Sequence, residues 1–155
     1  MYKIQVGTKN EILRKKIQKV TIFDQKLKKI VDDMKKIMTS PEDNKKKGVG
    51  LAANQIGLDL QILLVTFNVG TSKKQKIVTM INPEILEVYS QKVIMEEGCL
   101  SLPNEKTRKI SRVAKIKVRW QNLDGNFCEK KLTKWDARIF LHEYDHLQGV
   151  LYIDY

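Results

Sequence analysis

Two histidines four residues apart constrain this chain more than any other feature of its sequence. His142 and His146 are the only histidines among the 155 residues, and Glu143 directly follows the first of them. Side chains at this spacing share one face of an α-helix, where two histidines can bind a single metal ion. The glutamate between them is then placed to take a proton from metal-activated water. The alternative is a pair of packed histidines on an amphipathic helix, but the joint placement of all three residues favours a metal site.

A catalytic metal site needs a third protein ligand, because such sites commonly use three side chains and leave one position for water. A third histidine six positions after the second, as in metzincins, is excluded because Tyr152 stands there. A glutamate on a later helix, as in thermolysin-like enzymes, is excluded because only nine residues follow His146. Cys99 is the best upstream candidate, since a thiolate is a good ligand for iron or zinc. A small buried apolar side chain is the alternative for Cys99, and it is the preferred interpretation of Cys128.

The hydrophobic pattern predicts helices first, then strands, then the helix of the two histidines, which is typical of an α+β domain. Apolar residues at steps of three and four predict helices over Glu11 to Val20 and Asp24 to Met38. The second helix is expected to end near Ser40, because the residue before a proline disfavours helix, and a polar loop follows over Pro41 to Lys47.

Short segments that are rich in Val, Ile and Thr, or that alternate in polarity, predict six strands. They cover Gln61 to Asn68, Lys76 to Asn82, Ile85 to Tyr89, Lys92 to Met95, Ala114 to Asn122 and Asn126 to Leu132. Asp124-Gly125 is a hairpin signal between the last two strands. The final helix is expected over Ala137 to Leu147, with Thr133 or Asp136 as its cap and Gly149 at its end.

Length and composition predict one domain over residues 1–155 in the cytoplasm. No apolar run approaches the roughly 18 residues of a membrane span, and the N-terminus has no apolar signal-peptide region. The net charge of +11 is compatible with a nucleic-acid partner, but the lysine clusters contain few aromatic residues that could stack on bases. Most of the charge is therefore expected to be solvated surface with weak attraction to anionic partners such as ribosomes.

Three sequence motifs point to one family. Gly48 to Gln55 reads GVGLAANQ, Glu97 to Ser101 reads EGCLS, and His142 to His146 reads HEYDH. They resemble the peptide deformylase motifs GxGLAAxQ, EGCLS and HExDH, in the same order and with similar spacing. One motif alone would be weak, but the three together are specific, and the resemblance extends over nearly the whole chain.

The resemblance implies an enzyme that removes the N-formyl group from the formyl-methionine of newly synthesised polypeptides and releases formate. It implies an α+β fold in which antiparallel sheets pack around the C-terminal HExxH helix. One divalent ion per chain is expected, with Fe²⁺ preferred and Ni²⁺, Co²⁺ or Zn²⁺ as substitutes. The expected partners are N-formyl-methionyl nascent peptides and, transiently, the ribosome; no specific nucleic acid and no membrane are expected.

The motifs also imply roles for single residues. Cys99, His142 and His146 would bind the metal, and the hydroxide formed on it would attack the formyl carbon. Glu143 would accept the water proton and later deliver it to the leaving amine. The side-chain amide of Gln55 and the backbone N–H of Leu100 would stabilise the oxyanion of the tetrahedral intermediate.

The substrate is expected to bind as an added strand, a common mode of peptide recognition. Main chain near Val49 and near Glu97-Gly98 would pair with it, and Gly48 and Gly50 would keep the backbone slim beside it. Residues that share the helix face of His142 can wall an apolar pocket for the methionine side chain, although packing in the core is an equal alternative for them. These residues are Trp135 and Ile139.

Three other functions remain open at this point. A zinc peptidase that cuts internal peptide bonds would use similar catalytic chemistry. A basic nucleic-acid-binding module with a structural metal would need a fourth ligand, for which Cys128 would have to approach Cys99. A decayed homologue retained for binding is disfavoured because all the motif residues are intact, namely Gln55, Cys99, His142, Glu143 and His146.

Overall fold

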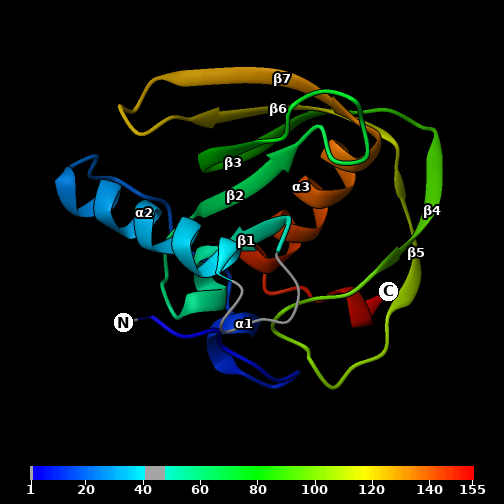
Figure 1. Cartoon of the computed structure of the whole chain (residues 1–155), viewed down its shortest axis with the longest axis horizontal. Coiled ribbons are helices and arrows are strands. Elements are labelled where there is room, and N and C mark those ends of the chain that lie inside the picture. Colours follow the sequence, from blue (N-terminus) through cyan, green and yellow to red (C-terminus); the bar gives the residue numbers. More distant parts are fainter. Residues whose placement is uncertain (1, 41–47) are drawn as a thin grey trace.

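The helix that carries both histidines lies against a five-stranded antiparallel sheet, with a separate two-stranded sheet along its side (Figure 1). The computed structural model describes residues 2–40 and 48–155. In chain order its elements are α1 (Glu11–Arg14), α2 (Gln25–Thr39), β1 (Gly50–Ala52), the 3₁₀ helix η1 (Ala53–Ile56), β2 (Ile62–Phe67), β3 (Lys76–Val88), β4 (Lys92–Glu97), β5 (Arg108–Val113), β6 (Lys115–Gln121), β7 (Phe127–Thr133), α3 (Lys134–Leu147) and the 3₁₀ helix η2 (Tyr152–Asp154). The α+β class and the antiparallel sheets are confirmed.

The five-stranded sheet has the order β1-β2-β3-β6-β7, with α3 packed on one face and α2 packed on part of the other. All six residues of the second strand, β2, are buried, because its side chains alternate between two apolar clusters. Leu63 and Val65 pack in the cluster that includes residues of α3. Ile62 and Leu64 pack in the cluster that includes residues of α2. The sheet is therefore a rigid centre that fixes α3 by apolar contact.

The two predicted N-terminal helices have different outcomes. The helix expected over Asp24 to Met38 is confirmed as α2, with Asp24 as the N-cap that accepts a hydrogen bond from the Leu27 N–H. The helix expected over Glu11 to Val20 is wrong beyond Arg14. Backbone N–H groups there bond to distant acceptors instead of to a helix, as those of Ile17 and Val20 do with Leu147 O and Asn82 Oδ1.

The strands differ from expectation at three places. The segments expected over Lys76 to Asn82 and Ile85 to Tyr89 are one strand, β3, whose register with β6 shifts between Ile81 and Glu84. The whole of β5 escaped prediction, because half of its residues are charged, and the three-residue β1 escaped it as well. The loop expected over residues 41–47 lies outside the described residues.

The second sheet consists of β4 and β5, paired from Lys92↔Val113 to Glu97↔Arg108. Its strand β4 ends at Glu97, which is the first residue of the EGC motif. In Figure 1 it runs beside α3 and towards the C-terminus.

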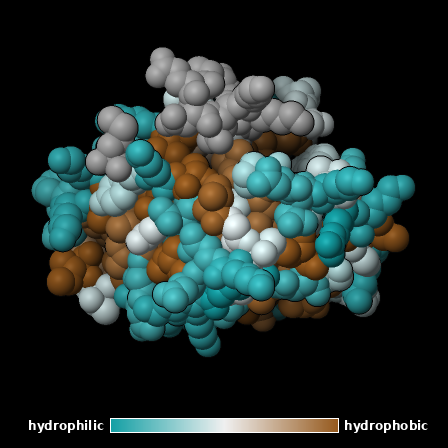
Figure 2. Space-filling view, turned by 90° about the horizontal axis from the view of Figure 1, so that it is seen from below, coloured by the Kyte–Doolittle hydropathy of each residue, from teal (hydrophilic) through white to brown (hydrophobic). Residues whose placement is uncertain are grey.

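No helix in the described part of the chain is long and apolar enough to cross a membrane. The face turned 90° from that view carries hydrophobic surface bordered by hydrophilic side chains (Figure 2).

Candidate active site

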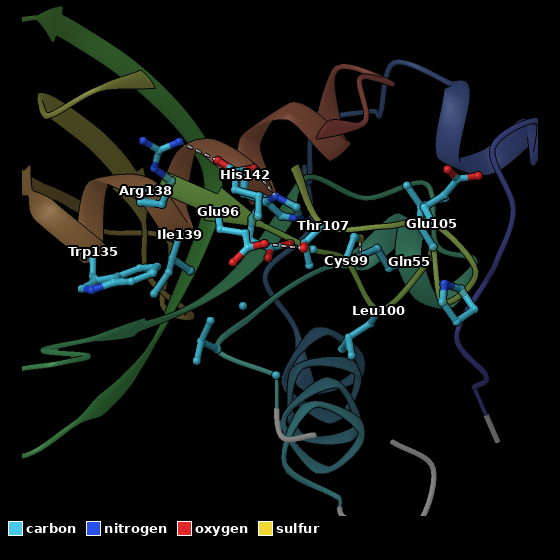
Figure 3. A pocket seen from close by; sticks show the side chains of 18 residues that line it. Gln55, Glu96, Cys99, Leu100, Glu105, Thr107, Trp135, Arg138, Ile139 and His142 are labelled. Carbon is cyan, nitrogen blue, oxygen red and sulfur yellow. Dashed lines mark hydrogen bonds and ion pairs between the residues drawn. The ribbon is translucent and has the colours of Figure 1, made fainter. Parts of the chain in front are cut away.

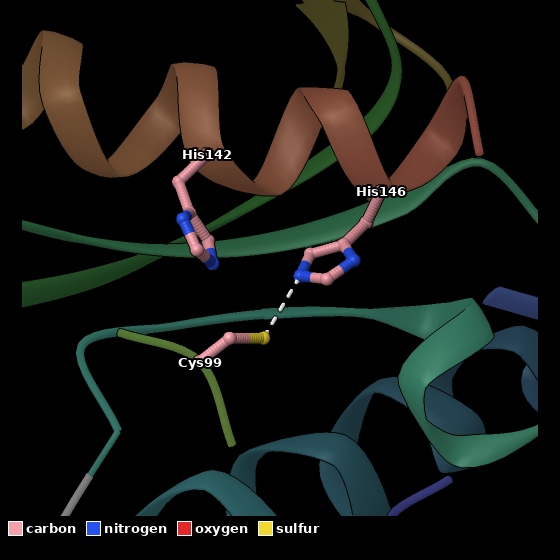
Figure 4. Close-up of side chains that lie close together, drawn as sticks. All are labelled: Cys99, His142 and His146. Carbon is pink, nitrogen blue, oxygen red and sulfur yellow. Dashed lines mark hydrogen bonds between the residues drawn. The ribbon is translucent and has the colours of Figure 1, made fainter. Parts of the chain in front are cut away.

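Cys99, His142 and His146 converge, as the sequence predicts. Both imidazole rings project from α3 towards Cys99, which approaches on the segment after β4 (Figure 4). The Cys99 Sγ lies 3.2 Å from His146 Nε2, and one ligand atom from each of the three residues lies within 4.8 Å of the others. Within residues 2–40 and 48–155, no second group of three His, Cys, Asp or Glu side chains lies close enough to hold an ion. Cys128 is not part of the group and packs against the apolar core.

The orientation of His142 is set by Glu97, the first residue of the EGC motif. A carboxylate oxygen of Glu97 lies 2.9 Å from His142 Nδ1. Because an ionised carboxylate only accepts, Nδ1 carries a proton, which leaves Nε2 as the candidate ligand atom of this ring. Burial alone would raise the pKa of Glu97, but hydrogen bonds from His142, Arg112 and Arg138 outweigh it and hold that pKa well below its usual range.

Two arginines hold the buried Glu97 carboxylate in place. Arg112 donates to both of its oxygens, at 2.6 and 3.0 Å, and Arg138 donates to one of them at 2.8 Å. Arg112 also donates to Asp145 at 2.7 Å. Asp145, three residues after His142 on α3, therefore forms an ion pair with Arg112.

Glu143 lines the same cleft and directly follows His142 on α3. It is buried, and the main cause of its raised pKa, about 7, is that burial. A Cβ atom at Gly50 would lie only 2.5 Å from a Glu143 carboxyl oxygen and 2.8 Å from its Cγ. Glycine at position 50 is therefore required by the close approach of β1 to this carboxyl.

Gln55 points its amide nitrogen at Cys99. The backbone N–H of Ala52 donates to Gln55 Oε1 at 2.8 Å, which fixes the orientation of the amide. Its Nε2 then donates to the Ser101 hydroxyl at 3.1 Å and lies 3.4 Å from the Cys99 Sγ. The side chain is almost fully buried, at 1% exposure. A donor at the edge of the candidate metal site is what the sequence predicts for Gln55.

A cleft of about 450 Å³ contains or borders the site. Figure 3 shows the cleft running from Trp135 past Ile139 and His142 to Cys99 and Gln55. Each residue that the sequence assigns to catalysis or substrate binding lines it, together with two of the three candidate ligands; these are Gly48, Val49, Gly50, Gln55, Glu97, Gly98, Leu100, Trp135, Ile139 and Glu143, with Cys99 and His142.

The cleft also has lining residues that sequence reasoning missed. Arg138 lines the cleft, although its side chain is buried and bonded to β4 and β5. Glu96 and Thr107 lie on the same wall, joined by a hydrogen bond of 2.5 Å from the threonine hydroxyl. One signal was available for Arg138: it stands one helical turn before His142, so both side chains leave the same face of α3.

Comparison with known proteins agrees with this geometry. The chain matches the Polypeptide deformylase family over residues 1–155. It is 42% identical over 154 residues to a peptide deformylase of Thermotoga neapolitana, covering 99% of this chain and 86% of that protein.

Solved structures agree as well. The crystal structure of peptide deformylase from Thermotoga maritima superposes with a TM-score of 0.86 at 42% identity, covering 99% of this chain and 96% of that one. A probable peptide deformylase from synechococcus phage S-SSM7 gives a TM-score of 0.87 at 32% identity, covering 100% of this chain and 99% of the other. The match over the whole sequence and the agreement of the fold show that this chain belongs to the polypeptide deformylase family.

Proposed function

We propose that this chain hydrolyses the formamide bond of N-formyl-methionyl peptides, which consumes water and releases formate and a free amino terminus. One observation carries the proposal: a thiol and two imidazoles converge within 4.8 Å in a cleft that a buried glutamate also lines. Membership of the polypeptide deformylase family supports the same reaction.

The donor set of Cys99, His142 and His146 fits a divalent transition metal. One thiolate and two neutral imidazoles suit iron, zinc, nickel or cobalt, and three protein ligands leave a position open. We propose Fe²⁺ as the resident ion, with Ni²⁺, Co²⁺ or Zn²⁺ as substitutes. When bound, the ion supplies Lewis acidity, polarising the formyl carbonyl and lowering the pKa of a water molecule.

Glu143 is the proton carrier in this proposal. Its carboxyl is buried next to the candidate ligands, and its Oε2 has no hydrogen-bond partner among the described residues. It therefore accepts the proton of the attacking water and passes it to the leaving amine nitrogen. Two donors stabilise the oxyanion that forms at the formyl oxygen: Gln55 Nε2, which lies 3.4 Å from the Cys99 Sγ, and the N–H of Leu100, the residue after Cys99.

The substrate backbone lies along β1, the edge strand of the five-stranded sheet. Thr66 N–H donates to Val49 O at 2.9 Å, so the alternation of an antiparallel ladder turns the N–H and C=O of Gly50 away from β2. An extended peptide can pair with this free edge and with Gly98 across the cleft. Trp135 and Ile139 wall the pocket for the methionine side chain.

The wider setting follows from the substrate. A chain that still carries formyl-methionine has just been synthesised, so we propose that the enzyme acts in the cytoplasm on nascent polypeptides. Transient contact with the ribosome through the basic surface is supported by the net charge of +11. Rates of peptide hydrolysis in the presence and absence of ribosomes, at low and high salt, test this contact.

Formate release from formyl-Met-Ala-Ser tests the function directly. Protein is loaded anaerobically with Fe²⁺ or Ni²⁺, and metal content is assayed in the parent and in Glu143→Gln. The parent is expected to release formate, and the variant to keep its metal but lose about 10²- to 10⁴-fold in rate. Metal-loaded, folded parent that releases no formate, or that instead cleaves a blocked internal peptide, contradicts the proposal.

A further inference from the structure

We infer that Arg138 is a positioning residue that fastens the β4–β5 wall of the cleft to α3, the helix that carries His142 and His146. The inference deepens the proposed function, on which its kinetic readout rests. Arg138 touches neither the candidate ligand atoms nor Glu143 through a hydrogen bond; it acts through the wall. Figure 3 shows its side chain beside His142, with the guanidinium turned towards the wall.

One guanidinium reaches three acceptors from three places in the chain. Arg138 donates to the backbone oxygen of Val93 on β4 at 2.5 Å and to that of Ile110 on β5 at 2.9 Å. It also donates to the Glu97 carboxylate at 2.8 Å. The side chain is 4% exposed, so water cannot easily replace these bonds. Both strands of the wall are therefore bonded to the same residue of α3.

Besides Arg138, the wall is held to the helix by two polar contacts, Arg112 with Asp145 and Glu97 with His142, and by little apolar packing. Val93 and Ile94 are exposed, and Ile110 is the one apolar side chain of β4 and β5 that is buried. Ile110 belongs to none of the three hydrophobic clusters of the described residues, and the half-buried Val113, at the end of β5, is the one residue of the two strands that packs against them. Hydrophobic burial therefore contributes little to the position of the wall, and the directional bonds of Arg138 and Arg112 take its place.

The two arginines have separable roles. Arg112 holds both oxygens of Glu97 and so maintains the contact between Glu97 and His142. Arg138 is the one that also bonds the backbone of both strands. Loss of Arg138 is therefore expected to loosen the wall, which includes Glu96 and leads into Gly98, while the Glu97 contact with His142 persists through Arg112.

Arginine is required because a single side chain must serve three acceptors. The planar guanidinium carries five N–H donors in a fixed arrangement, whereas a lysine ammonium is a compact group with three. Arg138→Lys is therefore expected to keep the charge but lose part of the anchoring. Arg138→Met keeps a stem of similar length along the cleft and loses every donor.

Hydrogen exchange of the metal-loaded protein tests the inference without substrate. In Arg138→Met, amides of β4 and β5 are expected to exchange at least about tenfold faster than in the parent, with those of β2 and β3 unchanged. Arg138→Lys should lie between the two. The matched control is Arg119→Met. It removes an ion pair with Glu84 on the face of the five-stranded sheet away from α3, and it should leave the exchange of β4 and β5 amides unchanged.

Unchanged protection of β4 and β5 in Arg138→Met, or faster exchange spread evenly over both sheets, overturns the inference. If Arg138→Met does not fold, Arg138→Lys decides by the same criterion: faster exchange confined to β4 and β5 supports it, and uniform or unchanged exchange refutes it.

Kinetics then separate positioning of the wall from damage to the chemical step. For formyl-Met-Ala-Ser, Arg138→Met is expected to raise KM about tenfold while kcat falls by less than about threefold, because substrate pairs with the wall. Loss of kcat with unchanged KM contradicts this. A parent that releases no formate refutes the proposed function alone, since the exchange experiment still decides the role of Arg138.

Discussion

The two sheets of this molecule are held in place by different forces. The five-stranded sheet packs against α3 on one face and against α2 over part of the other, and every residue of β2 is buried between apolar clusters. The β4–β5 sheet buries Glu97, Ile110 and Arg112, and its other apolar residues are partly or largely exposed. Apolar burial is not directional, whereas buried charges need specific partners at fixed geometry.

Because of this difference, we expect the stability of the protein and the geometry of the site to depend on different sheets. We call the five-stranded sheet and its clusters the apolar side. Mutations there should lower the free energy of unfolding and leave the cleft intact in the molecules that remain folded. We call the β4–β5 sheet with its buried charges the ionic side, or ionic wall. Mutations there should alter the cleft wall and the orientation of the candidate ligands while the five-stranded sheet persists, because a peripheral sheet can open locally. The changes below test this division, beginning with the largest expected effect.

Gly50→Ala is expected to be an exception to this division, because it changes a residue of the apolar side but disturbs the site. Gly50 lies in the five-stranded sheet, yet an added Cβ would lie 2.5 to 2.9 Å from three atoms of Glu143. The whole carboxyl would have to move, so formate release is expected to fall about 10²- to 10⁴-fold with metal content unchanged.

Gly48→Ala is the matched control for this change. There the added Cβ would lie 3.1 Å from Leu100 Cδ1 and 3.2 Å from Met38 Cγ, both in flexible side chains that can yield. Its rate should fall less than about tenfold, given the small cost of such an adjustment. Equal losses in the two variants would show that the backbone of residues 48–50, and not contact with Glu143, limits the reaction.

Leu64→Ala tests the apolar side by itself. Leu64 is fully buried on β2 in the cluster shared with α2, on the face of the sheet away from α3. Its truncation is expected to lower the free energy of unfolding by about 2–5 kcal/mol, measured by urea denaturation. The affinity of the folded protein for Ni²⁺ should stay within about twofold, because no contact of the site is lost. A large fall in affinity would show that packing at α2 reaches the site.

Glu97→Gln tests the ionic side. The amide cannot accept from His142 and both arginines as the carboxylate does, so the orientation of His142 loses its support. Loss of such an outer partner typically lowers metal affinity about 10- to 100-fold. Titration with Ni²⁺ under anaerobic conditions measures this directly. Unchanged affinity would mean that packing around His142 holds the ring without Glu97.

The same division explains which elements could be predicted from the sequence. The long amphipathic helix was placed within a residue at each end, because its apolar spacing and its Asp24 cap are local signals. The candidate ligands were also predictable, since the HExxH spacing places two of them on one helix face. β5 was missed because only one of its two buried positions is apolar. Ile110 occupies one and Arg112 the other, so no apolar alternation marks the strand.

Long-range hydrogen bonds account for two of the other differences. Residues 15–20 have helical apolar spacing, but the Gln18 N–H bonds to Asp59 and the Val20 N–H to Asn82, which favours an extended chain. The role of Arg138 depends on acceptors in β4 and β5, which no local pattern reveals. Sequence periodicity reports burial of apolar groups, and the ionic wall offers little of that signal.

Tyr155→Phe is expected to have the smallest effect and sharpens the comparison. The Tyr155 hydroxyl donates to Asp145 at 2.9 Å, and the ring lies 4.7 Å from the Arg112 guanidinium, at the outer end of the same cluster of charges. Because Tyr155 is 57% exposed, water can replace its hydroxyl, and the loss should be at most about 1 kcal/mol in unfolding free energy.

Affinity for Ni²⁺ should therefore change less than about twofold in Tyr155→Phe, against the much larger change in Glu97→Gln. That result would mean that each member of the ionic cluster matters in proportion to its burial. An equal loss in the two variants would mean instead that Glu97, Arg112, Asp145 and Tyr155 act as one cooperative unit. The ionic wall would then behave like a packed core, in which an exposed contact transmits its full effect to His142.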